Sequence, residues 1–292
     1  MSPVTDLPTA GGTLLTERAV IRVGGAGANA ALSAVEAGMD VRLIGCIGDD
    51  QLGEWTREQL APAGLDHELV VAAGEATGMT VVLESAARDR TFLTYLGVNA
   101  RWEAAMIPDD PLTCENLLLC DYFVAPMIRG EAARRLLDTA RARGARTFFD
   151  TTWDPDGFSA QARAEVRELL PSVDVFLPNE IEICALADRA GDPARAAHAL
   201  QAVSGGWVVV KLGRSGCLAV GPGGVEISVP APAVVVADTT GAGDAFNAGL
   251  VHALSGGASW HQALTQATRF ASTIISRPSD ERYKIALTGA QR

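Results

Sequence analysis

The stretch Asp238-Thr239-Thr240-Gly241-Ala242-Gly243-Asp244 decides the fold of this 292-residue chain. It follows an apolar run, AVVVA at 233–237, which predicts a buried strand, and precedes AFNAGLVHAL at 245–254, which predicts a helix. Glycines between a strand and a helix permit unusual backbone angles and close approach of a ligand. The N–H groups of a first helical turn and the helix dipole favour negative charge. The stretch therefore predicts an anion site at residues 238–244.

Asp244 stands at the start of the predicted helix, beside this anion site. A carboxylate next to bound phosphate is repelled unless its task is to take a proton, which phosphoryl transfer to an alcohol requires. The alternative is a glycine turn followed by an Asp that caps the helix. The seven-residue context favours the interpretation of Asp244 as a base.

Outward from this site, apolar strands alternate with helical runs. Such alternation predicts βαβ units and a mostly parallel sheet between helices, an α/β fold. We expect the main domain to span 24–68 and 99–292, and a small strand-rich domain to combine 1–23 with 69–98. The runs that predict strands are YFVAP at 122–126, ARTFFDT at 145–151, DVFLPN at 174–179 and WVVVKLG at 207–213, a hairpin at 217–230, and three short strands within 68–97.

Composition excludes several classes of protein. The formal net charge is −11, which disfavours binding to nucleic acid, and 48% hydrophobic residues suffice for a sizeable core. Since no run of about 18 apolar residues occurs, we expect no membrane partner, and the N-terminus does not resemble a signal peptide. The five cysteines form no CxxC pair and lie in apolar stretches, which predicts reduced core cysteines and a cytoplasmic location.

Two long stretches carry a resemblance to a known family. DTTGAGDAFNAGL at 238–250 resembles the C-terminal signature of the ribokinase, or phosphofructokinase-B (PfkB), family of carbohydrate kinases, and GGAGANAALSAVEAGMDVRLIGCIGDDQLGEW at 24–55 resembles its N-terminal signature. The resemblance covers about residues 8–277. It implies a ribokinase-like three-layer α/β/α sandwich with a small β-rich lid through which homodimers often form. It also implies ATP-dependent phosphorylation of a hydroxyl of a small sugar or sugar derivative, with Asp244 as general base and Gly241, Ala242 and Gly243 as the anion hole.

The resemblance further implies ATP and Mg²⁺ as cofactors. Asn179 and Glu182 in PNEIE resemble an N-x-x-E motif that places phosphates and Mg²⁺, with Glu182 acting through water, although Asn179 can cap the helix as well. The turn KLGRSG at 211–216 resembles the family's nucleotide-contacting turn. The positions of Asp238 and Thr240 bind a monovalent cation in many members, so K⁺ stimulation is expected. The cofactor-binding residues are thus Asn179, Glu182, Lys211, Gly213, Gly216 and Thr240.

On the substrate side, Gly24, Gly25 and Asn29 match the family's sugar-contacting G-G-x-x-x-N element, and the Asn29 amide offers both a donor and an acceptor to hydroxyls. Asn99, in YLGVNA, stands where family members bring a lid strand back to the sugar. Asp150 ends a predicted strand at the carboxyl edge of the sheet, where ligands bind in open α/β folds. A turn-forming Asp is the alternative for Asp150.

Two departures from the family pattern keep alternatives open. Only a handful of residues precede DLPTAGG at 6–12, so either the sequence begins late or the family's first strand and its substrate-binding Asp are absent. YFVAPMI at 122–128 also lacks the carboxylate that some pentose kinases place after this strand. The alternatives are a nucleoside kinase of the same family and a catalytically weak sugar- or nucleotide-binding protein. An NAD-binding Rossmann domain is set aside because GGAGAN lacks the G-x-G-x-x-G spacing.

Overall fold

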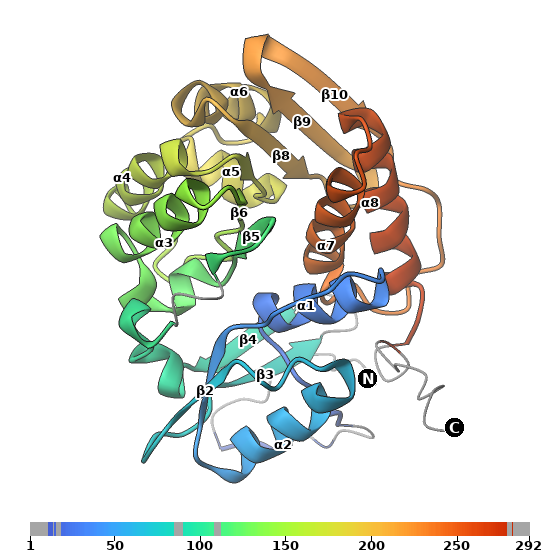
Figure 1. The fold of residues 1–292 in the computed structure, drawn as a ribbon. Helices are drawn as coiled ribbons and strands as arrows, with labels where there is room; N and C mark the ends of the chain where they lie inside the picture. Colours follow the sequence, from blue (N-terminus) through green and yellow to red (C-terminus); the bar gives the residue numbers. More distant parts are fainter. Residues whose placement is uncertain are drawn as a thin grey trace, which may run out of the picture.

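The computed structural model describes residues 11–13, 15, 19–84, 90–107, 112–278 and 282 (Figure 1). The whole segment before DLPTAGG, on which the expectation of an absent first strand depends, lies outside the described residues. No helix in the described part of the chain is long and apolar enough to cross a bilayer.

A six-stranded sheet in the order β10-β9-β8-β7-β6-β5 forms the centre of the molecule. β5 to β8 run parallel, which confirms the predicted parallel sheet. β9 and β10 add an antiparallel hairpin at one edge, as the sequence predicts. The strands are β5 (Asn116–Leu119), β6 (Arg146–Phe149), β7 (Val175–Phe176), β8 (Trp207–Lys211), β9 (Cys217–Gly221) and β10 (Val225–Val229).

Helices cover both faces of this sheet, because successive side chains of a strand point to opposite faces. Phe149 packs with α3 (Glu131–Ala142), α4 (Ala160–Leu169), α5 (Glu180–Leu186) and α6 (Pro193–Ser204) in one apolar cluster. Its neighbour Phe148 packs in a second cluster with α7 (Ala242–Ser255) and α8 (Trp260–Ile275). α1 (Ala26–Glu36) lies against α7 (Figure 1). The result is a three-layer α/β/α sandwich.

Four further strands lie outside this sheet. β1 (Gly45–Gly48) and β2 (Leu69–Ala72) pair in parallel across α2 (Gln51–Leu60), and β3 (Met79–Glu84) pairs antiparallel with β4 (Arg90–Tyr95). We call the β3–β4 pair the lid hairpin. β1 lies within residues 24–68, expected to belong to the main domain, and pairs with β2, which lies within residues 69–98, expected to join residues 1–23 in the small domain. Short 3₁₀ helices occupy Ala61–Ala63, Gly97–Ala100, Ala104–Met106, Tyr122–Val124, Pro126–Ile128, Leu170–Ser172, Gly213–Ser215 and Pro222–Gly224.

Two predicted strands are wrong. AVVVA at 233–237 is irregular: Val235 is 89% exposed, and the Ala237 N–H donates to the Ile275 carbonyl at the end of α8 rather than to a strand. YFVAP is also not a strand, because β5 ends earlier, at Leu119, and Asp121 turns the chain with a left-handed backbone (φ 58°, ψ 28°). An apolar run carries no information about whether a neighbouring strand is available to pair with it.

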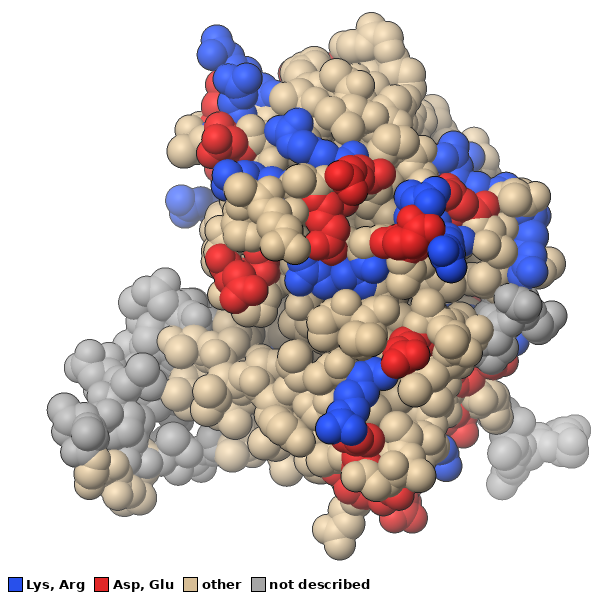
Figure 2. Space-filling model, turned by 90° about the vertical axis from the view of Figure 1, so that its left-hand side faces the viewer, with Lys and Arg blue, Asp and Glu red and all other residues tan. Residues whose placement is uncertain are grey.

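Charged side chains of both signs are interleaved on the face shown in Figure 2, and they gather into no basic surface there. Helix α3 illustrates the pattern, since Arg134 pairs with both Glu131 and Asp138. Interleaved charges on a chain with a net charge of −11 offer little attraction to a polyanion.

Candidate active site

The first turn of α7 presents N–H groups without a side-chain cap. Gly241 precedes the helix with a left-handed backbone (φ 75°, ψ 6°), which glycine adopts at no steric cost, and no side chain caps this end. The first N–H groups of a helix have no partner within the helix and attract anions. The Ala242 N–H already donates to the Thr239 carbonyl at 3.2 Å. An anion site formed by Gly241, Ala242 and Gly243 agrees with the absence of a side-chain cap and stays a prediction.

Asp244 lies in this first turn and meets Asn29 of α1, 215 residues away in the chain. The Asn29 Nδ2 donates to Asp244 Oδ2 at 2.9 Å. Burial raises the pKa of Asp244 to about 8, and the nearby Asp150 carboxylate adds to the rise, while the Asn29 hydrogen bond and the Lys211 ammonium oppose it. The structure thus brings the predicted base into contact with an element predicted to bind substrate, and burial shifts the pKa of this carboxyl group toward neutral pH.

Asp121 is a further acidic residue of the site, beside Asp244 and Asp150, and it was not predicted from the sequence. Its Oδ2 accepts from the Gly27 N–H at 3.1 Å, at the N-terminus of α1, beside Gly25. Burial raises the pKa of Asp121 to about 6, against the hydrogen bond from Gly27. The sequence predicts a strand at YFVAP, which has no carboxylate at its end. Placing the strand at NLLL (116–119) would have put Asp121 at its carboxyl edge.

The chain that follows Asp121 is held firmly. Tyr122 is buried, and its hydroxyl donates to Glu165 Oε1 at 2.6 Å and accepts from the Gly130 N–H at 2.9 Å. Arg129 binds the same Glu165 carboxylate through Nε and Nη2. This network, which links the segment after β5 to α4, fixes the backbone that carries Asp121.

A buried network lies next to the base. Lys211 Nζ and Asn247 Nδ2 each donate to Asp150 Oδ2 at 2.5 Å, and Asp150 is 3% exposed. Asp150, predicted to contact substrate, therefore has its Oδ2 occupied by protein donors. Lys211, predicted to contact nucleotide, likewise points to Asp150. Asn247, three residues after Asp244 on α7, was missed, although a polar side chain in an apolar helix is a signal for it.

Asn179 and Glu182 form a capping box at the N-terminus of α5. The Asn179 side chain accepts from the Ile181 and Glu182 N–H groups, and Glu182 Oε2 accepts from the Asn179 N–H at 2.8 Å. The helix-cap interpretation is thus confirmed for Asn179. Burial and the Asp150 carboxylate raise the pKa of Glu182 to about 7, while Lys211 opposes the rise. A positive charge near this buried carboxyl group favours its ionised form, as Lys211 does here.

The turn at 211–216 requires glycine for a structural reason. Gly216 has φ 95°, and a Cβ there would lie 1.9 Å from the Val229 carbonyl oxygen. Gly213 also has a positive φ, of 56°, and opens the 3₁₀ helix Gly213–Ser215. The backbone geometry of this turn explains both glycines, and a role in nucleotide binding stays a prediction.

Three further predicted residues, Asn99, Asp238 and Thr240, make contacts with other parts of the protein. Asn99 sits in the 3₁₀ helix Gly97–Ala100 and packs against Gly78 at the base of the lid hairpin. The carbonyl oxygens of Asp238 and Thr240, where K⁺ was expected, accept hydrogen bonds from the Arg282 guanidinium. The two carbonyl oxygens that would coordinate K⁺ are thus already bonded to the guanidinium, so these residues do not fit K⁺.

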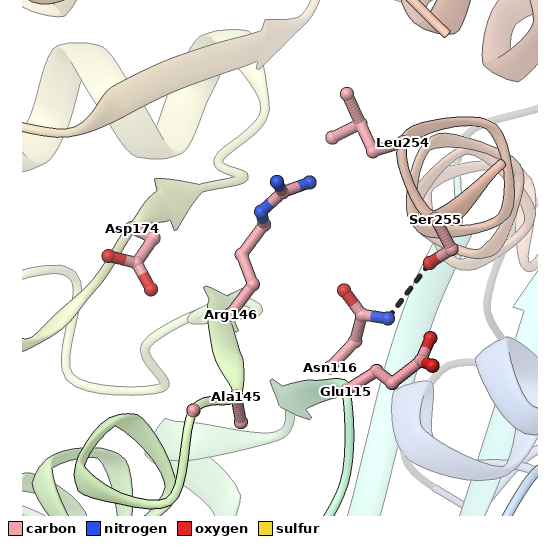
Figure 3. Close-up of a pocket in the computed structure, with 8 residues that line it drawn as sticks. Glu115, Asn116, Ala145, Arg146, Asp174, Leu254 and Ser255 are labelled. Carbon is pink, nitrogen blue, oxygen red and sulfur yellow. Dashed lines mark hydrogen bonds between the residues drawn. The ribbon is translucent and has the colours of Figure 1, made fainter. Parts of the chain in front are cut away.

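A polar pocket of about 500 Å³ lies at the opposite strand ends from this site (Figure 3). Asn116 and Arg146 begin β5 and β6, and Leu254 and Ser255 end α7, whereas Asp244 begins it. Asn116 Nδ2 donates to Ser255 Oγ at 2.8 Å, and Arg146 points into the pocket (Figure 3). This pocket is separate from the Asp244 site.

An uncapped helix N-terminus, a neighbouring carboxyl group of raised pKa and a parallel sheet with its strand ends at the site suit a phosphotransferase that acts on an alcohol group. The chain belongs to the pfkB family of carbohydrate kinases, whose profile matches residues 3–283.

Relatives and solved structures agree with this family. The ribokinase of Haemophilus influenzae is 27% identical over 274 residues, covering 91% of this chain and 85% of that protein. A nucleoside kinase of Methanothermobacter thermautotrophicus is 27% identical over 257 residues, 87% of this chain and 77% of that protein. An E. coli protein described as a ribokinase II, solved with ATP and Mg²⁺, matches with a TM-score of 0.77 and 23% identity over 90% of this chain and 87% of that one. The fold is ribokinase-like.

Proposed function

We propose that this protein transfers the γ-phosphoryl group of ATP to a hydroxyl of a small sugar or sugar derivative, with Asp244 as the general base. The observation that carries the proposal is the contact of Asn29 with Asp244, which joins the glycine-rich start of α1 to the uncapped start of α7. Asp121 lies at the same end of α1. Carboxylate and amide groups converging beside an anion site suit an acceptor with several hydroxyls.

In the proposed step, Asp244 accepts the proton of the acceptor hydroxyl while that oxygen forms a bond to the γ-phosphorus and the bond from phosphorus to the ADP oxygen breaks. The N–H groups at Gly241–Gly243 stabilise the negative charge on the transferring group. Asp121 and Asn29 orient the acceptor, and Gly24 and Gly25 let it approach the backbone. Asp150 binds Lys211 and Asn247 and so holds both side chains close to Asp244. Asn99 stays a predicted contact to the acceptor from the side of the lid hairpin.

ATP with Mg²⁺ fits the residues present. Mg²⁺ that is held largely by phosphates and water needs few carboxylates from the protein. Glu182 supplies a carboxyl group, and the Asn179 N–H that donates to its Oε2 fixes its orientation. When bound, Mg²⁺ neutralises phosphate charge. Gly213 and Gly216 shape the turn that is proposed to contact the nucleotide.

The five free cysteines agree with the proposed cytoplasmic location, because the cytoplasm keeps thiols reduced.

The lid hairpin is proposed to pair with that of a second copy. Met79 and Tyr95 lie opposite each other, as do Val81 and Leu93, so the four share one face of the hairpin. Their exposed fractions are 50%, 56%, 42% and 73%. A contiguous apolar face of this kind marks an interaction surface, and a two-stranded hairpin gains stability by adding partners.

Leu93→Glu is expected to convert the dimer to a monomer, because it places a charge in the centre of that face. Light scattering at several concentrations measures the change. Val235→Glu is the matched control, since Val235 is 89% exposed and lies outside the hairpin. A monomeric unchanged protein, or a dimer that survives Leu93→Glu, contradicts the proposal.

An ATP-consumption assay tests the proposed activity. The purified chain is given Mg²⁺-ATP and a panel of ketoses, aldoses, sugar acids, sugar phosphates and nucleosides, and release of ADP is followed. We expect release that depends on a sugar-like acceptor. Turnover on nucleosides alone establishes the alternative that the Methanothermobacter relative favours. Silence across the panel in a protein that still binds ATP favours the alternative of a catalytically weak binding protein.

A further inference from the structure

The Arg282 guanidinium is surrounded by backbone carbonyl oxygens. Its Nη1 donates to the Thr240 carbonyl at 2.6 Å, its Nη2 donates to the carbonyls of Asp238 and, at 3.4 Å, Ile275, and its Nε donates to the Arg277 carbonyl at 3.0 Å. Arg282 is only 7% exposed. Four carbonyl dipoles thus point at one buried positive charge.

This is the arrangement that oxygen ligands make around a bound monovalent cation. A guanidinium carries one permanent positive charge and five donors in a fixed plane, so it can satisfy several carbonyls at once. Asp238 and Thr240 begin the stretch that leads into the Gly241–Gly243 turn. The charge on Arg282 is therefore held directly behind the proposed anion site.

We propose that Arg282 is a tethered cation that takes the place of a bound K⁺ behind the anion site. The guanidinium fixes the carbonyls of residues 238–240, and thereby the N–H groups of the following turn, whatever the salt. The inference rests on the proposed function for its consequence at the nucleotide, but the structural role of Arg282 holds with or without kinase activity.

The Asp238 side chain supports the same role. Its Oδ1 accepts from the Thr240 N–H at 2.8 Å, and its Oδ2 pairs with Arg22 at 3.3 Å. Arg22 thus binds the side chain of Asp238, and Arg282 binds its carbonyl oxygen. Two arginines of the chain supply positive charge beside residues 238–240.

The first test needs neither nucleotide nor acceptor. The melting temperature of the protein is measured at equal ionic strength in KCl, NaCl and tetramethylammonium chloride. We expect the same value in all three salts for the unchanged protein. In Arg282→Gln we expect a lower melting temperature that KCl raises above its value in tetramethylammonium chloride, because the vacated carbonyls can bind K⁺.

The second test measures ADP affinity by calorimetry in the same salts. We expect the unchanged protein to vary by less than about twofold, and Arg282→Gln to bind about tenfold more weakly, the scale of one lost charge-assisted hydrogen bond. KCl should recover part of this loss. Arg195→Gln is the matched control, since Arg195 forms an exposed pair with Asp192 on α6, and it should match the unchanged protein.

Two outcomes overturn the inference. One is a selective effect of K⁺ on melting or ADP affinity in the unchanged protein. The other is an Arg282→Gln protein that behaves like Arg195→Gln. If Arg282→Gln does not fold, Arg282→Lys keeps the charge and must retain the salt-independent melting of the unchanged protein, and a K⁺-dependent Arg282→Lys also overturns it. If the melting and ADP-affinity results are as expected but no acceptor is phosphorylated, only the proposed kinase activity is contradicted.

Discussion

Asp244→Asn is expected to lower turnover by about 10²-fold or more, the scale of a lost general base. The Asn amide keeps the size of the side chain and can still contact Asn29, but it cannot accept the proton of the acceptor hydroxyl. ADP affinity should stay near that of the unchanged protein, because the N–H groups of the α7 turn are retained. Steady-state turnover on the best acceptor of the panel, with ADP calorimetry beside it, measures both effects.

The pH dependence gives a second view of the same residue. The proposed base Asp244 can accept a proton only when ionised, and with a pKa of about 8 its ionised fraction grows through that pH. The value of kcat/KM should therefore rise with pH up to about 8 in the unchanged protein. The residual activity of Asp244→Asn should lack this rise.

Asp138→Asn is the matched control, since Asp138 is exposed on α3 and pairs there with Arg134. It removes an Asp at a distance from the site and should leave turnover and its pH profile unchanged. Near-normal turnover of Asp244→Asn would remove Asp244 from the role of base and leave it as a helix-terminal carboxylate.

Lys211→Met is expected to lower the free energy of unfolding by about 3–5 kcal/mol, the scale of one partner lost from a buried ion pair. The Lys211 and Asp150 side chains are 12% and 4% exposed. Burial acts to lower the pKa of Lys211, but the Asp150 and Glu182 carboxylates raise it above its ordinary value, so the ammonium is the form that the fold uses. Met fills the volume and leaves the Asp150 charge without its cation. Urea unfolding measures the loss.

A double-mutant cycle separates the pair from the packing. Lys211→Met combined with Asp150→Asn should lose less than the sum of the single changes, by about 1–3 kcal/mol, because no charge is then left unpaired. Arg195→Met breaks the exposed Arg195–Asp192 pair and should change stability by less than about 1 kcal/mol. Additive losses in the cycle would show that Lys211 and Asp150 are not coupled.

Local pattern was informative wherever the signal lies within one element. The glycine turn and helix at 238–254, the parallel strands at β6 to β8 and the β9–β10 hairpin could all be predicted, because turn residues and apolar runs act over a few neighbours. The Asn179 cap was predicted for the same reason. The apolar runs at 122–126 and 233–237 were misjudged, because a strand also needs a partner, and pairing is a property of the whole sheet.

The sequence by itself determined the class of fold, the family and several of the residues that surround the proposed base, although Asp121 and Asn247 were not among them. Only the tertiary structure decided which of them meet. It brought Asn29 to Asp244 across 215 residues, turned Asp150 and Lys211 toward each other in the core, placed Asp121 at the start of α1, and set Arg282 among the carbonyls of residues 238–240. The physical reason is that burial and pairing of charges depend on chain segments that are far apart in sequence, whereas turns and caps depend on near neighbours.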